Sequence, residues 1–504
     1  MSVPLAVALL PLDRSGALTL HQQIYAGLRG AMLSGQIPGG TRLPATRRLA
    51  SELGVSRNTV VLAFDQLMAE GYLEAQVGAG TFVRSSLPER LLDVGRATRI
   101  ASGEAGIGLS QRGALLGADV SPAVQRPDHL RAFWPGLPDL TAFPVAIWSR
   151  LVDHHVRRPD PTLLGYGDPA GYYPLREAIA AYFATTRGVR CDAGQVVVVP
   201  GSQAALSFCA RLLVDPGDGI AIEDPGYPGA REAFRAAGAA LIPVPVDAEG
   251  IQLPGATRPG VARLVYTTPS HQFPTGATMS IGRRLELLAW ARETGAWILE
   301  DDYDGEYRYG GRPLPALQGL DEDGRVIYIG TFSKVLAPGI RIGYVVAPPA
   351  LVDAFVAARV RTDRGAPQLE QAALADLITE GHFSRHIRRT RNLYEERQAT
   401  FVDLIHRELG DLIDVQPSEA GMHLIGWLPD GTDDREASRL AAPPLRVAAP
   451  ALSSYALETP TRPGLVLGYA APSDAEMRDG VRDLGIALRT LARRTATRSG
   501  ERVR

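Results

Sequence analysis

The sequence is almost free of lysine. It has 504 residues, of which 53 are basic, yet Lys334 is the only lysine and all the others are arginine. Chance could leave one lysine in an arginine-rich chain, or this position could need an amine that arginine cannot supply. A guanidinium stays protonated in proteins, whereas a lysine amine can lose its proton and attack an aldehyde. Composition alone leaves both alternatives open.

Cysteine is also scarce, because only Cys191 and Cys209 are present. Two cysteines exclude a disulfide framework and a zinc site of paired cysteines, and we predict no metal site. The low cysteine content fits a reducing cytoplasm. The mildly apolar residues 3–12 are too short to span a membrane and lack a basic leading segment. We therefore expect no membrane segment, no signal peptide and a cytoplasmic location.

An excess of one charge is lacking too, since the formal net charge is −2. Any nucleic-acid site must therefore be a local patch on the surface. Hydrophobic residues make up 45% of the chain and charged residues 21%, as in soluble globular proteins. At roughly 100–200 residues per domain, the length predicts several folding units.

Residues 12–84 form the first predicted unit, with three helices followed by a hairpin. A helical repeat of apolar residues begins at Leu20, and Ser56 is a good N-cap for the third helix. Short strands are expected at residues 72–74 and 81–83. This order is typical of a winged helix-turn-helix, whose recognition helix enters the major groove by its N-terminal end. A protein-interaction module with a solvated arginine face is the alternative.

Four runs of this unit closely resemble the GntR family of winged-helix regulators. They read RLPATRRLA at 42–50, LGVSRNTV at 53–60, EGYL at 70–73 and GAGTFV at 78–83. The resemblance covers the whole unit and implies binding to a double-stranded DNA operator. It places the DNA contacts on Arg47, Ser56, Arg57, Asn58, Thr59, Gly78, Gly80 and Thr81.

Residues 131–495 alternate apolar strand candidates with helical stretches. The strand candidates lie near 196–199, 219–223, 262–266, 296–300, 326–329 and 343–346. Strands separated by helices predict an α/β domain with a mainly parallel sheet. Residues 85–130, before this domain, are rich in Gly, Ala, Ser and Arg without periodicity, and we predict a linker there.

The lone lysine lies in a motif that suits an aldehyde cofactor with a phosphate group. Hydroxyls of Thr331 and Ser333 precede Lys334, and Arg341 follows, so a phosphate can be bound next to a reactive amine. The string resembles the lysine motif of fold-type I aminotransferases. The resemblance implies that Lys334 bonds covalently to pyridoxal phosphate (PLP) and is the catalytic residue of the family's chemistry.

Other pieces follow in the order of that family. Gly201, Ser202 and Gln203 lie between a strand and a helix, where backbone N–H groups can bind phosphate, although such a turn is common. Asp301 ends an apolar strand and would pair with the pyridine nitrogen. Tyr303, on the same strand face, would reach the phenolic oxygen of the cofactor.

Two further tyrosines are assigned by the resemblance. Tyr227 resembles the aromatic residue that stacks on the pyridine ring, although it could be a core tyrosine. Tyr166 resembles the tyrosine that reaches the phosphate bound by the partner subunit. Both halves together resemble the MocR/GabR subfamily of GntR regulators. That resemblance implies a regulator that senses PLP, or PLP with a small amine or amino acid, as a homodimer with swapped DNA-binding units.

Two departures from working transaminases argue against efficient turnover. Phe273 precedes Pro-Thr-Gly where those enzymes usually place an asparagine, and Val466 lies where an arginine usually binds the substrate carboxylate. Arg462 could replace that arginine or be an ordinary surface cation. An active aminotransferase with an accessory DNA-binding unit is one alternative, and a purely structural cofactor site is another.

Overall fold

The computed structural model describes residues 12–14, 18–76, 78–87, 109–110, 113–114, 132–158, 160–252, 261–310, 314–442, 444–445, 447–457 and 462–502. The chain divides into two compact units, Met1–Gly108 and Leu109–Arg504. The linker predicted at 85–130 lies almost entirely outside the described residues.

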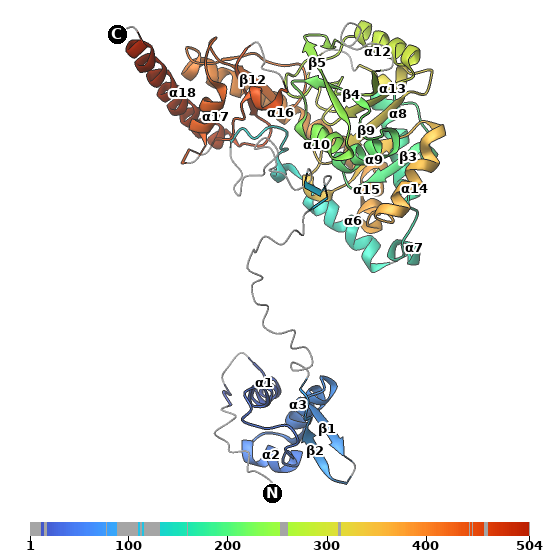
Figure 1. Ribbon diagram of the computed structural model, residues 1–504, viewed down its shortest axis with the longest axis vertical. Helices are drawn as coiled ribbons and strands as arrows, with labels where there is room; N and C mark the ends of the chain where they lie inside the picture. The colour runs from blue at the N-terminus through green and yellow to red at the C-terminus, as the bar shows by residue number, and fades with distance from the viewer. Residues whose placement is uncertain are drawn as a thin grey trace. The chain divides into compact units, whose positions relative to one another are not determined.

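The first unit has the predicted three helices and hairpin (Figure 1). Its elements are α1 (Leu20–Leu33), α2 (Thr46–Leu53), α3 (Arg57–Ala69), β1 (Leu73–Gln76) and β2 (Gly80–Val83). Ser56 caps α3, because its hydroxyl oxygen accepts the backbone N–H of Thr59 at 3.2 Å. The strands pair antiparallel, with Leu73 opposite Val83. The helices close over a core that includes Ile24, Leu28, Leu49, Val60, Phe64 and Leu67.

The second unit is built on an eight-stranded sheet of order β3-β10-β9-β8-β7-β4-β5-β6. The strands are β3 (Val196–Val199), β4 (Gly219–Asp224), β5 (Ala240–Asp247), β6 (Gly250–Ile251), β7 (Ala262–Thr267), β8 (Trp297–Asp302), β9 (Val326–Thr331) and β10 (Gly343–Val346). Five neighbouring strands run parallel to one another: β9, β8, β7, β4 and β5. Strand β10 is antiparallel to both of its neighbours, β3 and β9. The mainly parallel sheet predicted from the sequence is therefore confirmed.

Helices cover both faces of this sheet, as strand β3 illustrates. Val196 and Val198 pack in one hydrophobic cluster, while Val197 and Val199 pack in another. A strand buried on both faces has no polar alternation, which explains its run of four valines. The helices are α6 (Val145–Arg157), α7 (Pro161–Leu164), α8 (Tyr173–Arg187), α9 (Ser202–Leu213), α10 (Pro228–Ala237), α12 (Ile281–Thr294), α13 (Leu317–Leu320), α14 (Val352–Thr362) and α15 (Gln368–Thr379).

The C-terminal part adds a smaller sheet, two long helices and a short one. The sheet is antiparallel, with β11 (Asp414–Val415), β12 (His423–Trp427) and β13 (Gly464–Gly468). The helices are α16 (His382–Leu409), α17 (Asp434–Ala441) and α18 (Asp474–Arg502), the last of which passes the expected domain end at residue 495. Figure 1 shows α17, α18 and β12 grouped away from α8, α13 and α14. No helix in the described ranges has the length and hydropathy needed to cross a membrane.

Candidate functional site

A cavity of about 200 Å³ lies where strands of the large sheet end. Open parallel sheets commonly bind ligands at the carboxyl ends of their strands. The cavity brings together five of the predicted site residues: Lys334, Asp301, Tyr303, Tyr227 and Ser202. Its other lining residues are Trp134, Pro135, Gly136, Tyr266, Thr268, Phe273 and Tyr455.

Lys334 follows the end of β9 and extends its amine into the cavity. Its Nζ donates a hydrogen bond of 2.8 Å to the carbonyl oxygen of Gly136. Burial lowers the pKa of the Lys334 amine, although the carboxylates of Asp304 and Asp301 oppose this shift. A lowered pKa favours the neutral amine, which is the form that attacks an aldehyde.

Asp301 lies near the end of β8, which is the neighbour of β9, the strand that precedes Lys334. The hydroxyl of Tyr266 donates a hydrogen bond of 2.8 Å to its Oδ2. Its other oxygen, Oδ1, is buried and has no hydrogen-bond partner among the described residues. Burial raises the pKa of Asp301 to about 7, and the Tyr266 hydrogen bond opposes the rise. The carboxylate therefore has one oxygen held by the protein and one available to a ligand.

Tyr303 lies just beyond the last residue of β8 rather than on the strand. It still lines the cavity with Asp301, so the two side chains meet in one place although the expected strand alternation does not extend to Tyr303. The Tyr303 hydroxyl lies 3.0 Å from Nδ1 of His271, an additional polar contact that the sequence interpretation did not include.

Three of the predicted phosphate-binding residues, Gly201, Ser202 and Gln203, lie at the start of α9. Gly201 caps this helix with φ 89° and ψ 173°, a backbone conformation that is essentially restricted to glycine. A Cβ on Gly201 would lie 3.5 Å from a guanidinium nitrogen of Arg341, so the arginine is close to the helix N-terminus. Arg341 also donates to the carbonyl oxygen of Pro200 at 2.8 Å. A helix N-terminus beside a guanidinium favours an anion.

Thr331, Ser333 and Gln203 are also predicted phosphate ligands, and their contacts in the structure differ. The hydroxyl oxygen of Thr331, the last residue of β9, accepts the backbone N–H of Ser333 at 3.2 Å. Gln203 instead donates from its side chain to the carbonyl oxygen of Gly229 at 2.8 Å, which engages its amide within the protein. Of the three, Gln203 therefore has the least freedom to contact a phosphate through its side chain.

Aromatic rings form much of the cavity wall. Tyr227 packs edge-on against Phe273 with ring centroids 5.8 Å apart, and Phe273 also contacts Tyr303 and Tyr455. Burial raises the pKa of Tyr227 to about 12, so its hydroxyl stays protonated. Sequence reasoning missed Tyr266, although it ends a predicted parallel strand, as Asp301 does. No local pattern pointed to Tyr455.

Besides Gly201, Gln203, Thr331, Ser333 and Arg341, three more residues considered from the sequence are absent from the cavity lining. Tyr166 is 79% exposed, with the guanidinium carbon of Arg364 6.0 Å from its ring centroid. Arg462 stacks on Trp427 and lies 3.8 Å from a carboxylate oxygen of Asp414. Val466 is fully buried in β13. Among the described residues, the cavity lining contains no arginine.

The start of α3 presents the predicted DNA contacts. Arg57 and Asn58 are exposed, as is Arg47 on α2, and none of their side chains has a hydrogen bond or ion pair within the described ranges. Ser56 and Thr59 bond to each other through their hydroxyls at 2.8 Å, which leaves them partly committed to the helix cap. The side chain of Arg48 differs from that of Arg47, since it is paired with Glu52 at 2.8 Å.

The hairpin supplies the predicted wing. Gly78 and Gly80 have φ values of 78° and 114°, and Thr81 follows within β2. A Cβ on Gly80 would lie 2.9 Å from the Arg42 side chain, so a larger residue would displace that arginine. The tip therefore combines a backbone that glycine favours with a nearby cation.

Two family descriptions match the chain. Residues 20–83 match "Bacterial regulatory proteins, gntR family", and residues 146–481 match "Aminotransferase class I and II". The chain is 28% identical to a multiple substrate aminotransferase from Thermococcus profundus, with a TM-score of 0.68 over 77% of this chain and 98% of the other. It is 30% identical to the α-aminoadipate aminotransferase LysN from Thermus thermophilus, with a TM-score of 0.66 over 72% and 93%.

Curated relatives match nearly the whole length. The chain is 44% identical to the probable rhizopine catabolism regulatory protein MocR from Rhizobium meliloti, over 96% of each chain. It is 33% identical to the pyridoxine biosynthesis regulator PdxR from Corynebacterium glutamicum, over 95% of this chain and 97% of the relative. These matches confirm both resemblances drawn from the sequence motifs. The chain therefore belongs to the GntR family of bacterial regulatory proteins, as a DNA-binding transcription regulator of the MocR type with a large domain of the PLP-dependent aminotransferase class I and II family.

Proposed function

We propose that the cavity binds PLP and that the bound cofactor, alone or with a small amine or amino acid, controls binding of the operator. The observation that carries this proposal is the unpartnered Oδ1 of Asp301, which lies in the same cavity as the lone lysine. A buried carboxylate oxygen without a donor suits a protonated ring nitrogen. The residues present therefore fit the cofactor implied by the family.

Each part of the cofactor has a corresponding group in the protein. The Lys334 amine would bond to its aldehyde carbon, and Asp301 would accept the ring N–H. Tyr303 would hydrogen-bond the phenolic oxygen of the cofactor, and Tyr227 would contact the cofactor ring. When bound, PLP withdraws electrons from an amine attached to that aldehyde carbon. The phosphate would be held by Gly201, Ser202, Gln203, Thr331, Ser333 and Arg341, of which the helix N-terminus and Arg341 supply the favourable electrostatics.

Several features favour sensing over efficient turnover. Phe273 and Trp134 give the cavity an apolar wall, and no arginine among the described lining residues is placed to bind a substrate carboxylate. Val466 belongs to the same hydrophobic cluster as Tyr455, which lines the cavity. An active aminotransferase is the second candidate, because Lys334 and Asp301 share the cavity as that chemistry requires. Sustained formation of a keto acid from an amino acid would favour the enzyme, and a spectral change without product would favour the sensor.

One curated relative supports the cofactor itself as an effector. PdxR is named as a regulator of pyridoxine biosynthesis, which supports the cofactor itself as one signal for this chain. Comparing operator binding with and without PLP, and then with added amines, would separate the two kinds of effector.

Operator binding is proposed for the N-terminal half of α3, with α2 and the wing beside it. The side chains of Arg47, Arg57 and Asn58 are exposed and uncommitted within the described residues, which suits contacts to phosphates and base edges. Ser56, Thr59, Gly78, Gly80 and Thr81 complete the proposed contact set.

We also propose a homodimer with swapped DNA-binding units. Large apolar side chains are exposed along residues 140–173, including Val145, Leu164, Tyr166 and Tyr173. Exposed apolar clusters of this kind are typical of subunit interfaces, and Tyr166 would then reach the partner's phosphate site. Light scattering should give a dimer mass, and a monomer at micromolar concentration would contradict this part of the proposal.

The replacement Lys334→Ala tests the cofactor site directly. We expect the variant to lose the visible absorption band of covalently bound PLP and to give no pyridoxyl adduct after borohydride reduction, because no other lysine is present. The fold should be retained, since removing one cavity side chain seldom decides stability. Circular dichroism checks the fold. An unchanged cofactor band in the variant would refute the assignment of Lys334.

A further inference from the structure

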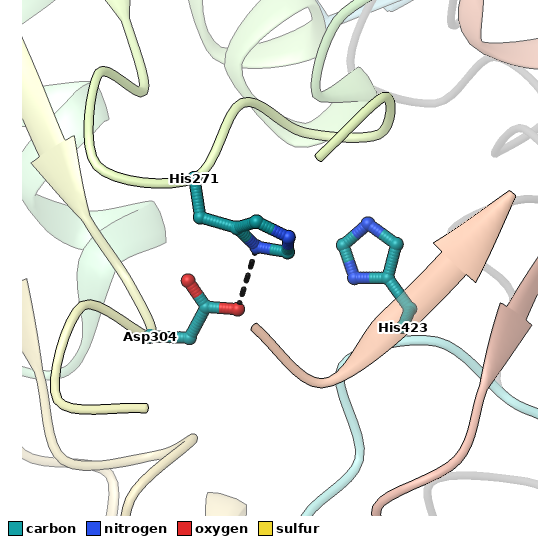
Figure 2. Close-up of side chains that lie close together, drawn as sticks. All are labelled: His271, Asp304 and His423. Carbon is teal, nitrogen blue, oxygen red and sulfur yellow. Dashed lines mark hydrogen bonds and ion pairs between the residues drawn. The ribbon is translucent and has the colours of Figure 1, made fainter. Parts of the chain in front are cut away.

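A second polar cluster lies beside the cavity and consists of His271, Asp304 and His423. One side-chain nitrogen or oxygen atom from each residue lies within 4.8 Å of those from the other two, and all three side chains are buried (Figure 2). His271 follows β7, Asp304 follows β8 and His423 begins β12. Because these segments are distant in the chain, their spacing gives no motif, and the sequence predicted no metal site.

The hydrogen bonds determine which ring nitrogens carry protons. A carboxylate only accepts, so Nδ1–H of His271 donates to Oδ2 of Asp304 at 3.0 Å, leaving a lone pair on Nε2. A carbonyl oxygen also only accepts, so Nε2–H of His423 donates to Pro274 at 3.0 Å, leaving a lone pair on its Nδ1.

Both lone pairs are buried and unused. His271 Nε2 and His423 Nδ1 have no hydrogen-bond partner in the described part of the chain, and neither does Oδ1 of Asp304. Figure 2 shows the two free nitrogens turned toward the space between the rings, whose centroids are 4.9 Å apart. The rings do not hydrogen-bond each other. A buried polar group without a partner is costly, so a cation or donor between the two nitrogens would be stabilised.

The charge of the cluster also favours a cation. Asp304 is 1% exposed, and within the described ranges its ion-pair partner is His271, with no arginine paired to it. The nearby Asp302 differs, because it is neutralised by Arg187 at 2.8 Å. The Lys334 amine acts on Asp304 electrostatically but forms no ion pair with it in the described part of the chain, and a buried carboxylate without an ion-paired cation is costly. A divalent cation bound to the imidazoles would supply that positive charge.

We propose that His271 Nε2 and His423 Nδ1 bind a divalent transition-metal cation, with Asp304 as the carboxylate that orients His271. Imidazole nitrogens suit Zn²⁺, at roughly 2.0–2.1 Å each, so a single ion can bridge two nitrogens up to about 4 Å apart. A carboxylate bonded to the other nitrogen of a ligating histidine fixes its tautomer and raises its basicity. Water would complete the coordination.

A glycine allows this arrangement. Gly421 has φ 90°, and a Cβ there would lie 1.9 Å from Cε1 of His271, so a side chain would displace the ring. Nδ1 of His271 is also 3.0 Å from the Tyr303 hydroxyl. A cation on Nε2 would therefore be only one imidazole ring away from a residue of the proposed cofactor site.

Zinc titration of the full chain tests the proposal. After chelator treatment, calorimetry with Zn²⁺ should show about one tight site per chain in the wild type. His423→Gln, which keeps an N–H donor for the Pro274 carbonyl, should lose that site. Asp304→Asn should weaken it by about 10–100-fold. His155→Gln is the matched control, because His155 also pairs with a carboxylate, Asp376, at 2.8 Å and should leave zinc binding unchanged.

Two results would overturn the metal site. Equal zinc stoichiometry and affinity in the wild type and His423→Gln would mean that water satisfies the two nitrogens. If His423→Gln does not fold, X-ray absorption of the wild type with one zinc equivalent decides the question without a variant. Two imidazole nitrogens in the metal shell would support the site, and a shell of oxygen atoms alone would refute it. Neither measurement depends on cofactor binding.

Discussion

Tyr266 holds one oxygen of Asp301 and leaves the other without a partner. The phenol donates to Oδ2 at 2.8 Å, while the buried Oδ1 has no partner among the described residues. This division assigns one oxygen to maintaining the carboxylate's position and one to a ligand. It also limits the cost of a buried charge, because the Tyr266 hydrogen bond opposes the rise in the pKa of Asp301 to about 7.

Asp301→Asn should weaken PLP binding by about 10–100-fold. The variant replaces a charge-assisted hydrogen bond, worth about 1.5–3 kcal/mol, by a weaker neutral contact. An absorbance titration with PLP measures the change. Tyr266→Phe is the companion variant and should cause a smaller loss, because it leaves Oδ1 in place. A larger loss in Tyr266→Phe than in Asp301→Asn would contradict this division of roles.

Glu306→Gln should stabilise the large domain at pH 8 and have little effect near pH 4.5. Burial raises the pKa of Glu306 from 4.5 to about 8, so the folded state holds a proton that the unfolded state has released. The contribution of this bound proton to the stability of the folded state is therefore complete below about pH 4.5. It is lost as the pH rises toward 8. At about 1.4 kcal/mol per pKa unit, the gain at pH 8 should be a few kcal/mol.

Thermal or denaturant unfolding of the large domain at several pH values measures this difference. The stability gap between Glu306→Gln and the wild type should widen steadily as the pH rises. A gap that stays constant with pH would show that the Glu306 side chain does not retain its proton in the folded state.

Gly201→Ala should weaken cofactor binding and destabilise the domain by about 1–3 kcal/mol. The φ of 89° and ψ of 173° fall in a region that alanine adopts only under strain. Relief of this strain would shift the start of α9 relative to Arg341. Gly217→Ala is a suitable control, since φ is 95° there but a Cβ would meet no atom within 4 Å. It should lower stability without changing PLP affinity, and equal loss of PLP affinity in both variants would count against the phosphate role.

Arg57→Ala should weaken operator binding by about 1–3 kcal/mol and leave PLP affinity unchanged. The guanidinium is exposed at the N-terminal end of α3 and has no partner within the described ranges. Fluorescence anisotropy with operator DNA measures the loss. Arg48→Ala provides the comparison, because that arginine is paired with Glu52 and should matter less. Equal losses in the two variants would contradict the proposed recognition helix.

Much of the fold could be predicted because its signals are local. Ser56 carries the cap signal in its own hydroxyl, and the valines of β3 show burial on both faces in four consecutive letters. Strand β5 escaped prediction because Pro243 and Pro245 interrupt the usual strand pattern. Prolines are tolerated near the edge of a sheet. In a central strand, each proline would remove a hydrogen bond to the neighbouring strand.

The site could be predicted only where one segment carries the chemistry. Lys334 stood out by composition, and Asp301 by its place at a strand end. Tyr455 and the pair of His271 and His423 depend on tertiary contacts between segments remote in sequence, which no periodicity encodes. Tyr303 joins Asp301 in the cavity from just beyond the strand, so alternation along a strand was the wrong reason for placing them together.

The position of Lys334 in the cavity limits which reagents can modify the lysine of this protein. Acylating reagents aimed at lysine have a single side-chain target in the whole chain, and it opens into a space of about 200 Å³. Only small reagents can enter, and any resident molecule would shield the amine. Mass spectrometry can follow the acylation rate of the peptide that contains Lys334. This rate therefore measures how fully the cavity is occupied.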